Sequence, residues 1–306
     1  MRLLVIANPL ARHLVMLERL PEETTITVSD RLEGLVDAAP EADVIFHCLG
    51  DGTLLRQIWP LARNVKWVHS MAAGVEEALF PELCASPVPL TNARGVHKRS
   101  LAEFVVAAIL FFAKDLRRML RNQAAARWEP FDIEELHGHV LGVVGYGEIG
   151  RASAELARAF GMEVRGVGRR HTRAERNALL AASDYVLVAA PATAETAGLI
   201  GETEIAVMKA NAVLINVGRG PVVDERALVH ALQRGRIRGA ALDVFNEEPL
   251  PTEHPFWRLE NVLLSPHCAD HTPVWMENAT ELFLRNFEHF VRGKPLENIV
   301  DKQAGY

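Results

Sequence analysis

The feature that most constrains this fold is the stretch from Val140 to Gly150, where an apolar run leads into three glycines and then a helical pattern. The glycines have the spacing Gly145-x-Gly147-x-x-Gly150. The first permits a tight turn, the second lets the backbone approach a pyrophosphate, and the third lets a helix pack against the strand. Glycines alone are common in turns. With a strand before them and a helix after them, they predict a dinucleotide-binding unit in mid-chain, with the helix start offering N–H groups to the anion.

Short apolar runs alternate with helical stretches almost throughout the chain, which indicates parallel α/β layers. Early strands are expected at 3–7, 25–28, 44–47 and 66–69, in a small domain that ends near Asn92. Later strands are expected at 141–145, 163–167, 185–189, 212–217, 239–243 and 262–264. A last helix near 274–292 would return to the first domain. The prediction is two open parallel-sheet α/β domains: a Rossmann domain over 96–284, inserted into a smaller flavodoxin-like substrate domain formed by 1–95 and 285–306.

Two helices are predicted in more detail. Ser100–Arg121 reads as one long apolar helix, with Ser100 as N-cap and Glu103 completing a capping box. Such a helix is expected to be buried against a neighbouring domain or a second subunit. In the helix after the glycines, Ile149, Leu156 and Phe160 are expected to share the side that faces the sheet.

Composition excludes several classes of function. The 39 acidic and 33 basic residues leave a net charge of −6 without a basic block, which argues against nucleic acid as a partner. The three cysteines form neither a metal pattern nor a disulfide framework, so we expect no metal and a reducing cytoplasm. The apolar run Phe104–Ala113 is too short to span a bilayer, so no membrane is expected as a partner. The N-terminal apolar run ends at Pro9 like a first strand, not like a signal peptide.

The strand after the glycine motif bears on the choice of cofactor. In this fold that strand usually ends in an acid that holds the ribose 2′-OH of NAD. Here Gly168 stands there and leaves room for a 2′-phosphate, which Arg169 and Arg170 can bind with charge-assisted hydrogen bonds. His171 and Thr172 are possible further donors. The alternative is a solvated basic turn. We expect NADP(H) to be preferred over NAD(H).

Polar groups follow three of the later strands, in the segments Asn216–Gly220, Asp243–Pro249 and Ser265–Thr272. Ligands of open α/β sheets bind at the carboxyl ends of the strands. An arginine can hold a carboxylate as a planar fork, and a histidine can exchange a proton near neutral pH. A carboxylate bonded to that histidine fixes its orientation and stabilises its protonated form.

These segments, with INVGRGPVVDERAL, GAALDVFNEEPLP and NVLLSPHCADHT, strongly resemble the D-isomer-specific 2-hydroxy acid dehydrogenases, which include the glyoxylate/hydroxypyruvate reductases. The likeness extends to WVHSMAAGVE, TNARGVHKRSLAEF and GKPLENIVDKQAGY, and so covers nearly the whole chain. The resemblance implies an oxidoreductase that reduces 2-oxo acids to D-2-hydroxy acids, and the turn at Gly168 adds the expected preference for NADPH. The alternatives are an NAD-linked dehydrogenase working oxidatively, of the 3-phosphoglycerate type, or a nucleotide-sensing corepressor-like protein.

The resemblance also implies roles for individual residues. Arg219 would bind the substrate carboxylate and carbonyl oxygen, and His267 would be the acid/base. Glu248, in preference to its neighbour Glu247, would pair with the histidine. Asp243 would hydrogen-bond the nicotinamide carboxamide.

Substrate and cofactor contacts complete the expected site. By the same resemblance, backbone N–H groups of Ala73 and Gly74 would cradle the substrate carboxylate, His97 would contact the substrate, and a closing cleft would bring the first two against Arg219 and His267. The side chains of Leu49, Gly50, His97 and Trp275 are candidates for shaping the pocket. The expected cofactor contacts are Gly145, Gly147, Glu148, Ile149, Gly150, Gly168, Arg169, Arg170, Pro191, Thr196, Val217, Gly218, Arg219, Asp243 and His267.

Two further expectations remain open at this stage. The family commonly forms homodimers, and the apolar helix fits that state, although a helix buried within one chain would look the same. Asp270 and His271 stand where the family more often has small residues. Asp270 either favours the protonated form of His267 or faces solvent.

Overall fold

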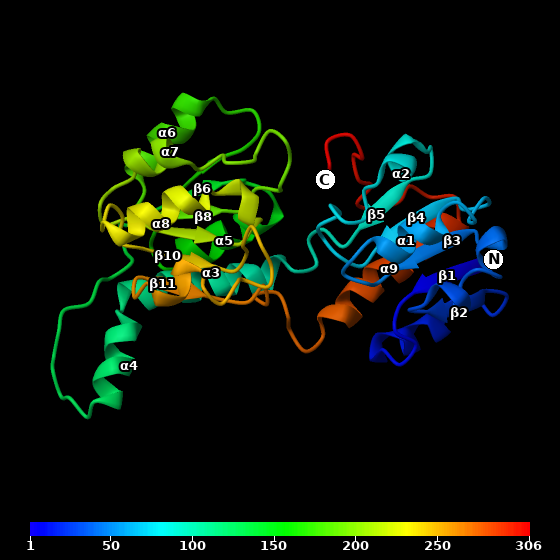
Figure 1. Cartoon of the computed structure of the whole chain (residues 1–306), viewed down its shortest axis with the longest axis horizontal. Coiled ribbons are helices and arrows are strands. Elements are labelled where there is room, and N and C mark those ends of the chain that lie inside the picture. The colour runs from blue at the N-terminus through cyan, green and yellow to red at the C-terminus, as the bar shows by residue number, and fades with distance from the viewer. The chain divides into compact units, whose positions relative to one another are not determined.

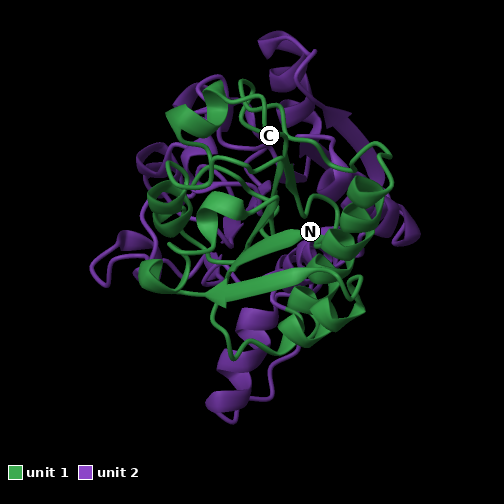
Figure 2. Cartoon of the chain, turned by 90° about the vertical axis from the view of Figure 1, so that its right-hand side faces the viewer, with its two compact units in different colours: residues 1–97, 272–306 green, residues 98–271 purple.

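The computed structural model describes residues 1–306, which fold as two compact units (Figure 2). Unit 1 comprises Met1–His97 and Thr272–Tyr306, and unit 2 comprises Lys98–His271. The sequence places the return to the first domain at residue 285. In the structure the whole of helix α9, Trp275–Val291, lies in unit 1, so the chain returns before this helix rather than within it.

Unit 1 contains a five-stranded parallel sheet in the order β2-β1-β3-β4-β5. This is the flavodoxin-like order, and the two-domain α/β prediction is confirmed. Four strands lie where they are expected, within a residue at each end, and β5 is an additional short strand. The strands are β1 Arg2–Ile6, β2 Thr25–Ser29, β3 Val44–His47, β4 Trp67–Ser70 and β5 Leu90–Asn92.

Successive side chains of a strand point to opposite faces of the sheet. Each face of this sheet therefore carries apolar side chains, and other elements cover both faces. Leu4 and Ile6 pack with α1 (Thr53–Ile58) and α2 (Pro81–Ala85), beside the short turns η2 (Leu32–Gly34) and η3 (Ala39–Glu41). The opposite face is covered by α9 and η1 (Arg12–Arg19). There the rings of Phe46 and Phe283 stack with centroids 4.0 Å apart.

Unit 2 contains a six-stranded parallel sheet in the order β11-β10-β9-β8-β6-β7, which confirms the six expected strands. From β6, the chain adds β7 on one side and β8 on the other, so the winding direction changes between β6 and β8. Ligands bind outside the carboxyl ends of strands at such a switch point. The strands are β6 Val140–Val144, β7 Glu163–Val167, β8 Tyr185–Val188, β9 Val213–Asn216, β10 Gly239–Leu242 and β11 Val262–Leu264.

Helices cover both faces of the second sheet, as Figure 1 shows. Leu187 faces a core shared with α3 and α5, whereas Val186 and Val188 face the core on the other side, with α6, α7 and α8. Short turns η4 and η5 lie in the later loops. The bounds are α3 Lys98–Ala113, α5 Glu148–Ala159, α6 Arg173–Ala182, α7 Glu202–Val207, α8 Glu225–Gln233, η4 Gly220–Val222 and η5 Pro255–Arg258.

The long apolar helix expected at Ser100–Arg121 is two helices, α3 and α4 (Leu116–Ala124). Asp115 separates them with a left-handed backbone (φ 47°), and its side chain accepts a hydrogen bond from the Arg118 N–H. The predicted capping box is wrong, because Ser100 lies inside α3 and Glu103 forms an ion pair with Arg99 at 3.0 Å. The apolar side of α3 is buried against α5 and the sheet of its own unit.

The side of α5 that faces its neighbours also differs from the prediction. Its buried residues are small: Gly150, Ser153, Ala154 and Ala157. Phe160 follows the last turn and is 45% exposed, so its predicted burial is wrong. Small side chains let α5 lie close to α3 and to the sheet, and this close approach leaves no room for a large ring. No helix of the chain is both long and apolar enough to cross a bilayer.

Candidate active site

The glycine-rich turn has the three environments that its sequence predicts. Gly145 has φ +96°, and a Cβ there would lie 2.6 Å from the carbonyl carbon of Ala189. A Cβ on Gly150 would lie 2.6 Å from the Gly145 carbonyl oxygen. A Cβ on Gly147 would meet nothing within 4 Å. Gly145 and Gly150 therefore serve close packing, whereas Gly147 borders open space that a bound pyrophosphate would fit.

The start of α5 suits an anion. No side chain caps this end of the helix, so Glu148, Ile149 and Gly150 open a first turn whose N–H groups lack intrahelical partners. The Glu148 carboxylate accepts hydrogen bonds from Arg151 Nη2 at 2.7 Å and Lys98 Nζ at 3.0 Å. The bond from Arg151, followed by that from Lys98, lowers the pKa of Glu148. This carboxylate is therefore ionised at neutral pH.

The turn after β7 carries the residues expected to choose between NADP and NAD. A Cβ on Gly168 would meet nothing within 4 Å, so the position is open. Arg169 is exposed, with Nε 3.8 Å from a Glu195 carboxylate oxygen, and Arg170 is exposed as well. The Gly168 N–H lies 3.1 Å from Nδ1 of His171, which folds back over the turn. Thr172 caps α6 in a capping box with Glu175, so its hydroxyl is committed to the helix end.

The loop after β8 is closed by the Thr196 hydroxyl. This hydroxyl donates to the Pro191 carbonyl at 2.6 Å and accepts from the Thr193 N–H at 2.8 Å. Thr196 therefore shapes the loop that carries Pro191. Both residues follow the carboxyl end of β8. The glycine turn lies at the same edge of the sheet.

The turn that carries Arg219 is fixed by a side chain to which the sequence assigned no role. Asn216, almost fully buried at the end of β9, accepts from the Gly218 N–H and donates to the Arg219 carbonyl, both at 3.1 Å. Val217 is buried, and its N–H donates to Val188 in the sheet. Arg219 Nη1 donates to the Gly218 carbonyl at 2.8 Å, which orients the guanidinium. The sequence signal available for Asn216 was a polar residue at the end of an apolar predicted strand.

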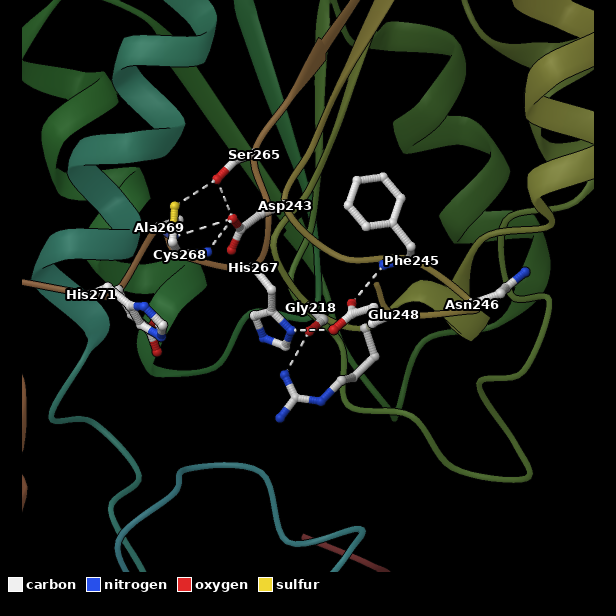
Figure 3. A network of polar contacts seen from close by, with 12 residues as sticks. Gly218, Asp243, Phe245, Asn246, Glu248, Ser265, His267, Cys268, Ala269 and His271 are labelled. Atoms are coloured by element: carbon white, nitrogen blue, oxygen red, sulfur yellow. Dashed lines mark hydrogen bonds and ion pairs between the residues drawn. The ribbon is translucent and has the colours of Figure 1, made fainter. Parts of the chain in front are cut away.

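His267 and Glu248 meet although they lie on loops after different strands (Figure 3). His267 Nδ1 lies 2.6 Å from Glu248 Oε2, and the Phe245 N–H donates to Glu248 Oε1 at 2.8 Å. The contact is made by Glu248, the acid that the sequence preferred over Glu247. Both oxygens of the carboxylate are thus engaged, and Nδ1 is fixed while Nε2 remains as the ring atom for proton exchange. The partner N–H of Phe245 could not be read from the sequence.

Asp243 holds the loop that carries His267. It is 1% exposed, and Oδ1 accepts from Ser265 Oγ at 2.5 Å, the Cys268 N–H at 3.0 Å and the Ala269 N–H at 3.2 Å. Burial is the largest influence on Asp243 and raises the pKa of this carboxyl, against the opposing effect of these hydrogen bonds. Asp270 forms an ion pair with its neighbour His271, with Nε2 and Oδ1 3.7 Å apart.

The remaining candidates belong to unit 1. Ala73 and Gly74 follow β4, and the amide of Asn92 donates to the Ala73 carbonyl at 2.6 Å. The N–H groups of Ala73 and Gly74 make no hydrogen bond within the chain. His97 is buried, with its ring centroid 5.9 Å from that of Trp275. The structure therefore brings together two of the predicted pocket residues.

Comparisons with known proteins agree with this architecture. Residues 106–269 match the family described as D-isomer specific 2-hydroxyacid dehydrogenase, NAD binding domain. A glyoxylate reductase of Aeropyrum pernix is 36% identical over 89% of this chain and 87% of its own length. A glyoxylate/hydroxypyruvate reductase B of Yersinia pestis is 32% identical over 83% of this chain and 82% of its own.

A solved structure extends the likeness to the whole fold. A D-isomer specific 2-hydroxyacid dehydrogenase of Xanthobacter autotrophicus, in complex with NADPH and MES, superposes with a TM-score of 0.87 at 29% identity. The superposition covers 99% of this chain and all of that one. The resemblance read from the motifs is confirmed. The chain belongs to the D-isomer specific 2-hydroxyacid dehydrogenases, a family of NAD(P)-dependent oxidoreductases that act on CH–OH groups.

Proposed function

We propose that this enzyme is an NADPH-preferring reductase that converts small 2-oxo acids, glyoxylate and hydroxypyruvate foremost, into D-2-hydroxy acids. The observation that carries the proposal is the 2.6 Å contact between His267 and Glu248 at the carboxyl edge of a dinucleotide-binding sheet. The names of the relatives, glyoxylate reductase and glyoxylate/hydroxypyruvate reductase, support the substrate class.

Proton transfer is the part of the reaction that these side chains perform. A bound reduced nicotinamide supplies the hydride to the carbonyl carbon. Protonated His267 donates from Nε2 to the carbonyl oxygen as negative charge develops there, so that C=O becomes CH–OH. Glu248 stabilises the imidazolium before the transfer and holds the neutral ring afterwards. The ring then regains its proton from water.

Other residues bind and orient the reactants in this proposal. Arg219, aimed by its bond to the Gly218 carbonyl, pairs as a planar fork with the substrate carboxylate and carbonyl oxygen. The unpartnered N–H groups of Ala73 and Gly74 are the second carboxylate ligand. Asp243 orients the nicotinamide carboxamide, and His97 contacts the substrate.

The preference for NADPH rests on the turn after β7. Gly168 supplies neither a carboxylate for a ribose 2′-OH nor a side chain that would occupy the space of a 2′-phosphate. Arg169 and Arg170 are exposed at the same turn and supply positive charge. The solved relative from Xanthobacter autotrophicus, which was crystallised with NADPH, supports this assignment.

A homodimer is also part of the proposal. Helix α4 and the loop after it extend away from the rest of unit 2 (Figure 1). They expose Leu120, Ile133 and Trp128, the last at 95%. Apolar side chains on such an extension suit a second copy of the chain. Light scattering on Trp128→Ser should give a smaller mass than the wild type.

Location in the cytoplasm stays a prediction from cysteine usage.

One steady-state experiment tests the activity. NADPH and NADH oxidation would be followed with glyoxylate, hydroxypyruvate, pyruvate and bulkier branched or aromatic 2-oxo acids. We expect the highest kcat/KM for glyoxylate and hydroxypyruvate with NADPH as the cofactor. A strong preference for NADH, or oxidation of 3-phosphoglycerate in place of these reductions, would overturn the proposal.

A further inference from the structure

The first residue of α5 is charged, although the glycine fingerprint requires no charge there. Glu148 lies at the helix start where, under the proposed function, the pyrophosphate of the dinucleotide binds. An unpaired carboxylate at this point would repel the pyrophosphate. Two cations prevent this: Lys98 Nζ lies 3.0 Å from one carboxylate oxygen and Arg151 Nη2 lies 2.7 Å from the other. Two cations against one carboxylate leave one positive charge in excess beside the helix start.

The two cations have different attachments. Arg151 is on α5 itself, and its Nη1 also donates to the Tyr146 carbonyl at 3.3 Å, so its guanidinium serves the glycine turn. Lys98 comes from another element, the first residue of α3. Because α3 packs along α5, Lys98 is held beside the first turn of α5. Its side chain is 49% exposed, and an ammonium group has three N–H donors, of which the Glu148 contact uses one.

We propose that Lys98 is an additional cofactor-binding residue, whose ammonium group pairs with the pyrophosphate while its ion pair with Glu148 keeps it beside the start of α5. This inference rests on the proposed function, because it takes the site to bind a nicotinamide dinucleotide. It assigns the pyrophosphate a ligand that lies 47 positions before the first glycine of the fingerprint (145 − 98). Sequence motifs of the dinucleotide fold do not include such a residue.

The assignment makes a prediction that separates Lys98 from the arginines after β7. NADPH and NADH share the pyrophosphate, so loss of Lys98 should weaken both by the same factor. Arg169 and Arg170 face the proposed 2′-phosphate, so their loss should weaken NADPH alone. The fragment 2′-AMP carries the 2′-phosphate without the pyrophosphate, so its binding should not depend on Lys98.

The test measures Kd for NADPH and NADH by nucleotide fluorescence, and for 2′-AMP by competition, in low and moderate salt. The variants are Lys98→Met, Lys98→Arg and the control Arg99→Met. Arg99 is the next residue of α3, is largely exposed and pairs with Glu103, so its loss removes the same charge from the same turn. Melting temperatures of all variants would verify folding.

We expect Lys98→Met to raise Kd for both dinucleotides by about 10-fold, as for one hydrogen bond between charged groups. It should also flatten the salt dependence of binding. Lys98→Arg should retain most of the affinity, while Arg99→Met and all measurements with 2′-AMP should match the wild type. Unchanged Kd values in a folded Lys98→Met, or a loss of affinity confined to NADPH, would overturn the assignment of Lys98 but not the proposed function. A wild type that binds neither dinucleotide would overturn the proposed function, and this inference with it.

Discussion

Glu248 links two loops: one carboxylate oxygen lies 2.6 Å from Nδ1 of His267, and the other accepts the N–H of Phe245 at 2.8 Å. A carboxylate bonded at both oxygens cannot rotate freely, so the imidazole has a fixed direction before substrate binds. The pair therefore combines orientation with charge, and substitution of either partner tests its role.

Replacement of His267 should remove the proton donor and leave the cofactor site intact. We expect His267→Ala to lower kcat for 2-oxo acid reduction by about 100- to 10,000-fold. NADPH affinity, measured by fluorescence, should change little. Near-normal turnover in this variant would contradict the proposed acid/base role.

Replacement of Glu248 by glutamine should remove the charge and one of the two acceptor oxygens, since an amide has a single oxygen for His267 Nδ1–H and the Phe245 N–H. Reduction needs protonated His267, and the carboxylate favours that form. In Glu248→Gln we expect kcat for 2-oxo acid reduction to fall by about 10- to 100-fold, because the imidazolium loses its paired charge, while NADPH affinity should change little. Turnover close to that of the wild type would contradict the proposed role of Glu248.

Gly147 and Gly150 should respond differently to a methyl group. A Cβ on Gly150 would lie 2.6 Å from a backbone oxygen, so Gly150→Ala should destabilise the protein by about 1–3 kcal/mol. A Cβ on Gly147 would meet open space, so Gly147→Ala should melt like the wild type but bind NADPH more weakly. Thermal melts with and without NADPH measure both effects. Equal destabilisation by the two variants would count against the assignment of Gly147 to the pyrophosphate.

Cofactor preference should reverse at Gly168. The open surroundings of this residue admit an aspartate, whose carboxylate can hold a ribose 2′-OH and repel a 2′-phosphate. Gly168→Asp combined with Arg169→Ala should shift the NADPH/NADH ratio of kcat/KM toward NADH by about 10- to 100-fold. Arg165→Ala is the matched control, since Arg165 is exposed on β7 and pairs with Glu163 instead. A similar shift in the control would show that general charge sets the preference.

Unit 1 should lose stability in mild acid because of His69. This residue is fully buried in β4, with Nδ1 2.7 Å from the Thr91 hydroxyl, and burial lowers its pKa from 6.5 to about 3. Between pH 6.5 and about 3, the unfolded chain therefore binds a proton at His69 that the folded chain does not bind. Stability attributable to His69 is complete above pH 6.5 and falls as the pH drops toward 3, by at most about 1.4 kcal/mol per pH unit.

A pair of variants checks this titration. Asparagine has an amide near the position of Nδ1, so His69→Asn should give a melting temperature that varies less with pH below 6.5 than that of the wild type. The exposed His230 serves as control, because His230→Asn should keep the acid sensitivity. Parallel pH curves for wild type and His69→Asn would assign the effect to other groups.

Strand positions were predictable from the sequence because a buried parallel strand is apolar on both faces and is bounded by turn residues. The break at Asp115 was not, since one residue in a left-handed conformation interrupts an otherwise continuous helical pattern. The start of α3 was missed for a related reason: Ser100 and Glu103 have capping-box spacing, but the helix already begins at Lys98.

The candidate site was predictable only where side chains act directly. His267, Glu248 and Arg219 stand in motifs, and the first two are in contact in the structure. The bond from the Phe245 N–H to Glu248 depends on the local fold of one loop, and the contact of Asp243 with Ser265 joins two separate segments of the chain. Such contacts leave no periodic signal in the sequence. Their assigned roles in catalysis stay predictions.

The packing of α9 on the first sheet sets the order in which the protein can be completed during synthesis. A ribosome finishes the continuous segment 98–271 before it makes the helix that carries Phe283, the ring that stacks on Phe46. Until then, the face of the first sheet with Phe46 and Trp67 has only η1 over it and lacks α9. The nascent chain therefore holds one finished unit and one sheet whose aromatic face is only partly covered, and chaperones bind such surfaces.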